Sequence, residues 1–265
     1  MFAHEADGGE LDCPPGMGVH PTATAFGLVA EEYERGRPGY PQEAVDWLVE
    51  HAGLDGSSVV VDVAAGTGKL TRMLVPMVGR VVAVEPSDGM RSALAAAVPR
   101  AEAVDGTADR LPLADGAAQA ITVAQAFHWF AGDEALAEFQ RVVGPGGWLA
   151  IVYNRRDQEQ PLQRRLEEIV SRHRGDRVPS VKSGRWREVI DATTRFAADG
   201  EASFPNPVEM TAATLVDRVA STSIIASLPD DERAAALAEV RALGDAEPER
   251  FPLEHVTEVR LYRAG

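Results

Sequence analysis

A pair of glycines directly after a run of β-branched residues is typical of a ligand-binding turn. Val59–Val63 is apolar almost throughout and is expected to be a central strand buried on both faces. Gly66 and Gly68 can adopt backbone conformations that a Cβ penalises, and they let a ligand approach the main chain. A helix is expected to follow at once and to extend to about Val75. The stretch therefore predicts a βα unit that carries a ligand on its turn.

An acid at the end of the next expected strand narrows the choice of ligand. In a doubly wound sheet the carboxylate of Glu85 comes to lie beside the first turn, where it can accept both hydroxyls of a ribose. A dinucleotide site normally has a third glycine, which is Thr71 here. Asp62, at the strand end, would oppose a phosphate but attract an ammonium. An adenosine that carries an amino acid is therefore favoured over NAD.

The elements that position these residues alternate along the chain. Strands are expected at residues 58–64, 80–85, 101–104, 120–124 and 148–153, with helices at 42–52, after the glycine turn, at 87–97 and at 134–142. A further strand with a turn is expected near 195–204, and a closing strand at 256–262. This order predicts an α/β fold, a Rossmann-like, doubly wound and mostly parallel seven-stranded sheet with a helical cap inserted after strand five.

Composition excludes several classes of protein. The 265 residues include 26 basic and 41 acidic ones, and the net charge of −15 repels nucleic-acid backbones. No apolar run approaches the ~20 residues that a membrane span needs. The N-terminus has no basic or apolar secretory pattern, and the only cysteine is Cys13, which excludes a disulfide framework and a cysteine-rich metal site. We therefore expect a cytoplasmic protein without a metal.

Five motifs in order carry a resemblance to a known family. They are VDVAAGTGKLT at 61–71, VEPS at 84–87, GTADRLP at 106–112, AQAFHWF at 124–130 and RVVGPGG at 141–147, with YERGRPGYP at 33–41 upstream. Together they resemble the class I S-adenosylmethionine-dependent methyltransferases. Within these, the chain is similar to the small-molecule type (type 11) that includes trans-aconitate and ubiquinone- or menaquinone-pathway enzymes. The resemblance covers residues 58–153 continuously.

The resemblance implies S-adenosyl-L-methionine as the cofactor. It implies that the glycine turn holds the methionine part, Asp62 the ammonium and Glu85 the ribose hydroxyls, with Arg37 in a lid over the site. Two residues depart from the commoner pattern, Ala64 in place of glycine and Thr107 in place of an acid. The implied cofactor-binding set is Tyr33, Arg37, Asp62, Ala64, Ala65, Gly66, Thr67, Gly68, Leu70, Glu85, Pro86, Met90, Thr107, Ala108, Asp109, Ala124, Gln125 and His128.

The methyl transfer that the resemblance implies needs few catalytic groups, because the sulfonium methyl is already activated and positioning supplies much of the rate. His128 is the leading candidate base, since its unperturbed pKa is near 6.5. The alternative, which we favour, is that His128 packs against the cofactor and shapes the pocket.

Arg155 is expected just past the end of strand five, where it either pairs with a substrate carboxylate or is a surface arginine. The candidate substrate residues are His20, Phe26, Tyr33, Trp129, Tyr153 and Arg155.

The expected segments are a mobile tail at 1–19, N-terminal lid helices at 20–57, a cofactor-binding core at 58–153, a substrate-cap region at 154–252 and a closing strand at 253–265. The cap is expected to hold helices at 161–174, 211–221 and 230–243. The stretch that follows the first of these helices, up to residue 191, is poorly patterned.

The expected function is methyl transfer to a small organic acceptor, at oxygen or nitrogen rather than carbon. The alternatives are a non-methylating relative that keeps the cofactor, cyclase-like or regulatory, and an NAD-type oxidoreductase, which Thr71 disfavours. The expected partner is the small-molecule acceptor, without nucleic acid or membrane, and the protein is expected to be a monomer or homodimer.

Overall fold

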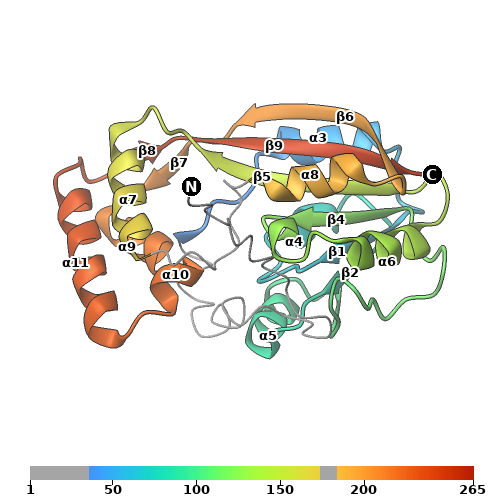
Figure 1. The fold of residues 1–265 in the computed structure, drawn as a ribbon, viewed down its shortest axis with the longest axis horizontal. Helices are drawn as coiled ribbons and strands as arrows, with labels where there is room; N and C mark the ends of the chain where they lie inside the picture. The colour runs from blue at the N-terminus through green and yellow to red at the C-terminus, as the bar shows by residue number, and fades with distance from the viewer. Residues whose placement is uncertain (1–35, 174–183) are drawn as a thin grey trace, which may run out of the picture.

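A seven-stranded sheet forms the centre of the molecule (Figure 1), in a computed structural model that describes residues 36–173 and 184–265. The strand order is β3-β2-β1-β4-β5-β9-β6. The first five strands run parallel, and β9 lies antiparallel between β5 and β6. The predicted Rossmann-like, mostly parallel seven-stranded sheet is confirmed. The strands are β1 (Val59–Val63), β2 (Arg80–Val84), β3 (Glu102–Val104), β4 (Ala120–Ala124), β5 (Trp148–Arg156), β6 (Phe196–Pro205) and β9 (His255–Ala264).

Helices cover both faces of this sheet. Because side chains alternate along a strand, Val60 packs into one apolar cluster and Val61 into another on the opposite face. The Val60 cluster includes residues of α3 (Gln42–His51) and α4 (Thr71–Leu74). The Val61 cluster includes residues of α6 and α8 and the short η2 segment. The remaining helices of the core are α5 (Asp88–Ala97), η2 (Phe127–Trp129), α6 (Asp133–Val143) and α8 (Arg185–Ala192).

A second group of elements lies to one side of the sheet, at the left in Figure 1, and we call it the cap. It has its own apolar cluster, in which Leu166, Leu215 and Val240 are buried. Its elements are α7 (Pro161–Arg172), β7 (Val208–Met210), α9 (Ala212–Ala220), α10 (Ser223–Ala226), α11 (Asp230–Asp245) and β8 (Phe251–Leu253). A cap with a separate core can present side chains to the sheet edge without contributing to the sheet.

Strand β5 is longer than the sequence pattern suggests. It continues to Arg156 because antiparallel β9 pairs with it as far as the Arg156–His255 register position. Arg155 therefore lies within the strand, and the expectation that it lies just past the strand end is wrong. The strand thus carries residues from the centre of the sheet as far as the cap.

Helix α8 lies in the stretch that the sequence pattern leaves unassigned. Only Trp186 and Ile190 of its eight residues are buried, too few to give a periodic signal. Both residues belong to the cluster on the α6 side of the sheet, so α8 covers the sheet rather than the cap. Trp186 contacts Phe127 and Tyr153, with ring centroids 6.2 and 4.9 Å away.

The segment that precedes α3 docks against the cap through backbone contact. A Cβ on Gly36 would lie 2.1 Å from the backbone nitrogen of Arg218 in α9. The next residue, Arg37, donates from Nε to Ser221 Oγ (3.0 Å) and from Nη2 to Ser221 O (2.9 Å). The absence of a side chain at Gly36 is therefore what allows Arg37 to reach the end of α9.

We expect Gly36→Ala to lower the free energy of unfolding by about 1–3 kcal/mol, because the added methyl must displace backbone. Gly39→Ala is the matched control, since a Cβ at Gly39 meets nothing within 4 Å, and its effect should stay below about 0.5 kcal/mol. Urea denaturation of both variants measures the difference. Equal stabilities would contradict the backbone contact between this segment and α9.

Candidate functional site

The turn after β1 places three residues in the left-handed region of backbone space. Ala64, Gly66 and Gly68 have φ values of +54°, +58° and +83°. A side chain at Gly68 would also crowd α5, because its Cβ would lie 3.0 Å from Leu94 Cγ. Ala64 adopts this conformation with a Cβ, at a cost of about 1–2 kcal/mol. The turn thus exposes backbone groups at the end of β1, as the glycine spacing predicts.

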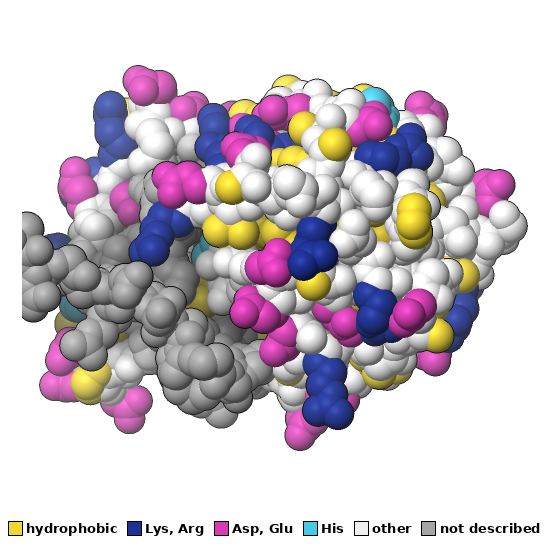
Figure 2. All heavy atoms as spheres, turned by 45° about the vertical axis from the view of Figure 1, so that its right-hand side comes forward, with side chains coloured by type: hydrophobic (Ala, Val, Ile, Leu, Met, Phe, Trp, Pro, Cys, Tyr) yellow, Lys and Arg dark blue, Asp and Glu magenta, His cyan; other side chains and the backbone are white. Residues whose placement is uncertain are grey.

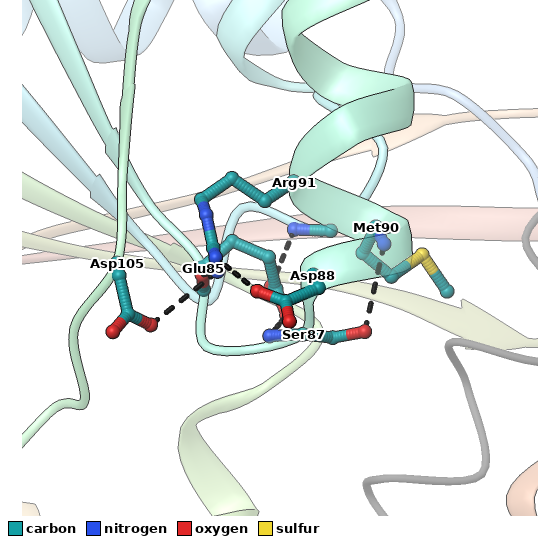
Figure 3. Close-up of polar contacts among 7 residues, drawn as sticks. Glu85, Ser87, Asp88, Met90, Arg91 and Asp105 are labelled. Atoms are coloured by element: carbon teal, nitrogen blue, oxygen red, sulfur yellow. Dashed lines mark hydrogen bonds and ion pairs between the residues drawn. The ribbon is translucent and has the colours of Figure 1, made fainter.

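Glu85 fixes this turn from the neighbouring strand (Figure 3). Its Oε2 accepts a hydrogen bond from the Gly66 N–H and its Oε1 from the Ser87 N–H, both at 2.9 Å. The side chain is only 7% exposed, and burial raises the pKa of its carboxyl, while the two N–H donors act in the opposite direction. Glu85 does lie beside the first turn, as expected from the sequence. A carboxylate oriented in this way can accept further bonds from hydroxyl groups.

The guanidinium next to Glu85 has other acids to pair with. Arg91 donates from Nη1 to the backbone oxygen of Glu85 at 2.7 Å and forms ion pairs with Asp88 and Asp105 (Figure 3). Ser87 caps α5, as predicted, by accepting from the Met90 N–H. The cap and the Arg91 contacts hold the start of α5 against the carboxylate, and the charge of Arg91 lowers the pKa of Glu85, against the effect of burial.

Asp62 is the most deeply buried acid of the site. Its Oδ2 accepts from Thr71 Oγ1 at 2.6 Å and its Oδ1 from Thr122 Oγ1 at 2.8 Å. Burial raises its pKa to about 6, against the effect of both hydroxyls and with a smaller contribution from the charge of Glu85. Thr71, which stands where a dinucleotide fingerprint has glycine, therefore serves as a support for Asp62.

A small cavity opens beside Asp62 and brings in two residues that the sequence reasoning did not assign. Its walls include Tyr40 and Lys69. The signal for Lys69 was present in the sequence, because it follows Gly68 directly and the chain has only one other lysine, Lys182. A cavity lined by an acidic and a basic residue suits a zwitterionic amino-acid moiety. The other lining residues are Ala64, Ala65, Leu70 and Ala124.

His128 and Tyr153 form a second cluster past the end of β4. The Tyr153 hydroxyl lies 3.0 Å from His128 Nδ1 and also accepts from the His128 backbone N–H at 3.0 Å. Burial, with a smaller effect of the nearby Arg37 charge, lowers the pKa of His128 to about 3. The imidazole is therefore neutral at physiological pH, and Tyr153, held by Trp186, fixes its orientation.

The other predicted cofactor residues lie in the segments that follow β1, β2, β3 and β4. Thr67 and Leu70 are buried in and after the glycine turn, and Pro86 precedes α5, where Met90 is buried. Thr107 closes a tight turn with Arg110, which leaves Ala108 buried and Asp109 exposed. Gln125, directly after β4, has a φ of +63°, a strained value for a residue with a side chain.

The predicted substrate residues are less closely gathered. Trp129 packs against His128, with ring centroids 4.9 Å apart. Arg155 is 55% exposed and pairs with Glu258 at 2.9 Å, which fits the alternative of a surface arginine. His20, Phe26 and Tyr33 lie outside the described residues.

The burial of Asp62 makes stability depend on pH. The folded protein holds the Asp62 proton up to about pH 6, whereas the unfolded chain releases it near 3.8. Between these two pH values the folded protein therefore binds more protons than the unfolded chain, and its free energy of unfolding falls as the pH rises.

We expect the free energy of unfolding of Asp62→Asn, which carries no charge at this position, to rise by about 2–3 kcal/mol relative to that of wild type between about pH 4 and pH 7. Urea denaturation across this range measures the gain, and parallel profiles would refute the buried charge.

Comparison with known proteins assigns the chain to a family. Residues 61–151 match the model of a methyltransferase domain. The chain is 40% identical over 219 residues to an uncharacterised methyltransferase of Mycobacterium tuberculosis, covering 83% of this chain and 85% of that protein.

Two solved structures share the fold of this chain. A geranyl diphosphate methyltransferase in complex with S-adenosylmethionine is 13% identical, with a TM-score of 0.51 and coverage of 84% and 85%. The cyclase SpnF is 18% identical, with a TM-score of 0.53 and coverage of 86% and 84%. On this sequence identity, and with the sheet and glycine turn described above, the chain belongs to the class I S-adenosylmethionine-dependent methyltransferases.

Proposed function

We propose that the protein transfers the methyl group of S-adenosyl-L-methionine to oxygen or nitrogen of a small organic acceptor. The observation that carries the proposal is the cavity beside the glycine turn, whose walls include Asp62 and Lys69, with the Glu85 carboxylate at the same turn. These groups complement the ammonium, the carboxylate and the ribose hydroxyls of that cofactor. A dinucleotide would present phosphates to the acids instead, which is unfavourable.

Each charged residue has a role that its surroundings support. Asp62 receives the ammonium group, and an adjacent cation lowers its raised pKa and so favours its charged form. Lys69 receives the carboxylate from the same cavity. Glu85 keeps lone pairs for the ribose hydroxyls beyond its bonds to Gly66 and Ser87. Met90 and Ala108 border the adenine, as the resemblance implies.

His128 is better suited to shaping the pocket than to taking a proton. With a pKa near 3 it is unprotonated at neutral pH but is a weak base, far from the optimum for general-base catalysis. Tyr153 holds the imidazole in one orientation. The cofactor supplies an activated methyl group when it is bound. What remains for the residues of this chain is to align the acceptor with it and to exclude water.

The surface supports a small acceptor rather than a polyanion. Figure 2 shows Lys and Arg side chains interspersed with Asp and Glu over one face of the molecule, and the net charge of the chain is −15. Among the described residues, no helix is both long and apolar enough to cross a membrane.

A second candidate function is cofactor-dependent catalysis without methyl transfer. The cyclase SpnF has this fold, and His128 here is a weak base, so the alternative has a specific basis. Incubation with methyl-labelled cofactor and a small-molecule cell extract separates the two functions. A labelled small molecule supports methyl transfer, whereas bound cofactor without any labelled product supports the cyclase-like function.

We expect calorimetry to detect binding of S-adenosylmethionine and of its demethylated product. Glu85→Ala should weaken this binding by about 1.5–3 kcal/mol, because hydrogen bonds to a charged acceptor are lost. Glu102→Ala is the matched control, since Glu102 is half exposed on the edge strand β3 and pairs with Arg80. Its affinity should equal that of wild type. No heat with either ligand, or an unchanged affinity in Glu85→Ala, would refute the assignment.

We also expect the imidazole of His128 to stay neutral down to about pH 4, because burial lowers its pKa to about 3. Proton NMR of the histidine Cε1–H resonances against pH measures this, and His128→Gln identifies the resonance by removing it. A midpoint between about pH 6 and pH 7, the ordinary range of histidine, would restore the role of a general base.

A further inference from the structure

Two asparagine side chains hold one backbone oxygen of the segment that precedes α3. Asn154 Nδ2 donates to the oxygen of Gly39 at 2.9 Å, and Asn206 Nδ2 donates to the same oxygen at 3.0 Å. Asn154 is on β5, and Asn206 directly follows β6. The two hydrogen bonds therefore tie this segment to the end of the sheet.

A buried threonine orients both amides. Thr257, on β9, lies opposite Asn154 in the register of β5 and β9 and is fully buried. Its Oγ1 donates to Asn154 Oδ1 at 2.6 Å and lies 3.1 Å from Asn206 Nδ2, from which it accepts. Because Asn154 Oδ1 accepts from the threonine, it is Asn154 Nδ2 that points toward Gly39. We call Asn154, Asn206 and Thr257 the Gly39 clamp.

The backbone of Asn206 is restricted by its neighbours in the sequence. The residue lies between Pro205 and Pro207, and a residue before proline is confined to extended conformations. Its own N–H donates to the backbone oxygen of His255 at 2.8 Å. An amide on so restricted a backbone loses less conformational entropy when it binds Gly39 than one on a flexible loop. The clamp is therefore a rigid support for the segment.

The clamp fixes the position of Tyr40. The oxygen of Gly39 and the nitrogen of Tyr40 belong to one planar peptide group, so the two amides orient the peptide at which Tyr40 begins. Pro41 follows as the N-cap of α3 and confines Tyr40 to an extended backbone. Tyr40 lines the cavity together with Asp62 and Lys69. The clamp thus places one wall of the cavity that is proposed to receive the amino-acid part of the cofactor.

Strand β5 orients groups on both faces of the sheet at this end. Side chains alternate along a strand, so Tyr153 and Asn154 point to opposite faces. The hydroxyl of Tyr153 contacts His128, whereas the amide of Asn154 contacts Gly39. Two consecutive residues of β5 therefore support the imidazole on one face and the wall of the cofactor cavity on the other.

We propose that Asn154, Asn206 and Thr257 are positioning residues for cofactor binding, which hold Tyr40 against the amino-acid part of S-adenosylmethionine through the backbone of Gly39. This inference rests on the proposed use of that cofactor and adds how one wall of its site is held. The clamp residues are not among those that line the cavity, so they act through Tyr40 and do not bind the ligand themselves. Loss of the clamp weakens ligands that reach Tyr40 and spares ligands that end at the adenosine.

The test compares two ligands that differ in the part that reaches Tyr40. S-adenosylhomocysteine, the demethylated product, carries the amino-acid part, whereas 5′-methylthioadenosine has the same adenosine and sulfur without it. Calorimetry on the full chain measures both affinities. Asn154→Ala/Asn206→Ala removes both bonds to Gly39 and should weaken S-adenosylhomocysteine binding by about tenfold, since each bond contributes modestly. The affinity for 5′-methylthioadenosine should change by less than about twofold.

Gln160→Ala is the matched control. The Gln160 side chain donates to the backbone oxygen of Pro252 at 2.9 Å and accepts from the backbone N–H of Glu254 at 3.1 Å. The control therefore also loses two hydrogen bonds between an amide and the backbone, but none to the segment before α3. Its ratio of the two affinities should equal that of wild type. An unchanged ratio in the double variant, including equal weakening of both ligands, would overturn the proposal.

Hydrogen exchange keeps the test decisive if 5′-methylthioadenosine binds too weakly to measure or the double variant does not fold. In wild type, S-adenosylhomocysteine should slow exchange in peptides that cover residues 36–44. In Asn154→Ala and in Asn206→Ala this protection should fall by about threefold, and in Gln160→Ala it should not. Equal protection in wild type and both clamp variants would also overturn the proposal.

The same measurements separate this inference from the proposed function. Failure of wild type to bind S-adenosylhomocysteine defeats the proposed function. Normal binding by wild type, with an unchanged ratio of affinities in the clamp variants, defeats the positioning role alone.

Discussion

The hydrogen bond from the Gly66 N–H to the Glu85 carboxylate is the contact on which the site depends. It joins the turn after β1 to the end of β2, and it forms because the two parallel strands pair in register up to Val63 and Val84. The same carboxylate accepts from Ser87 at the start of α5. One buried acid thus positions a glycine turn, a helix start and its own remaining lone pairs. Without the parallel register these parts would not meet.

The fold and the cofactor side of the site could be predicted because their signals are local. Glycines with positive φ, an acid at a strand end and alternating strands and helices follow each other closely in the sequence, and each has one structural meaning. The place of Lys69 in the cavity wall could have been expected on the same basis, because it follows Gly68 directly. The support that Thr71 gives to Asp62 is harder to predict, because it requires knowledge of which threonine faces the buried acid.

The parts that could not be predicted depend on distant pairings. Strand β5 extends to Arg156 only because β9, about a hundred residues later, pairs with it. Helix α8 is held by Trp186 against Phe127 and Tyr153, a contact without a periodic signal. Arg155 could have faced a substrate, but Glu258 on β9 pairs with it instead. In each case a residue far along the chain decides the outcome.

Two buried charged residues, one in the core and one in the cap, share a physical character. Asp62 is an acid whose surroundings offer it hydroxyls and no cation among its hydrogen-bond partners, and Arg218 is a base whose surroundings offer it a neutral histidine. Each is costly in the folded protein, since burial disfavours the charged form of both. A protein under selection for stability alone would lose such groups, because apolar residues of similar volume often replace buried charges without loss. The buried acid at Asp62 is explained if the ammonium group of a ligand completes it, because an adjacent opposite charge favours the charged form of the carboxyl and offsets the cost of its burial.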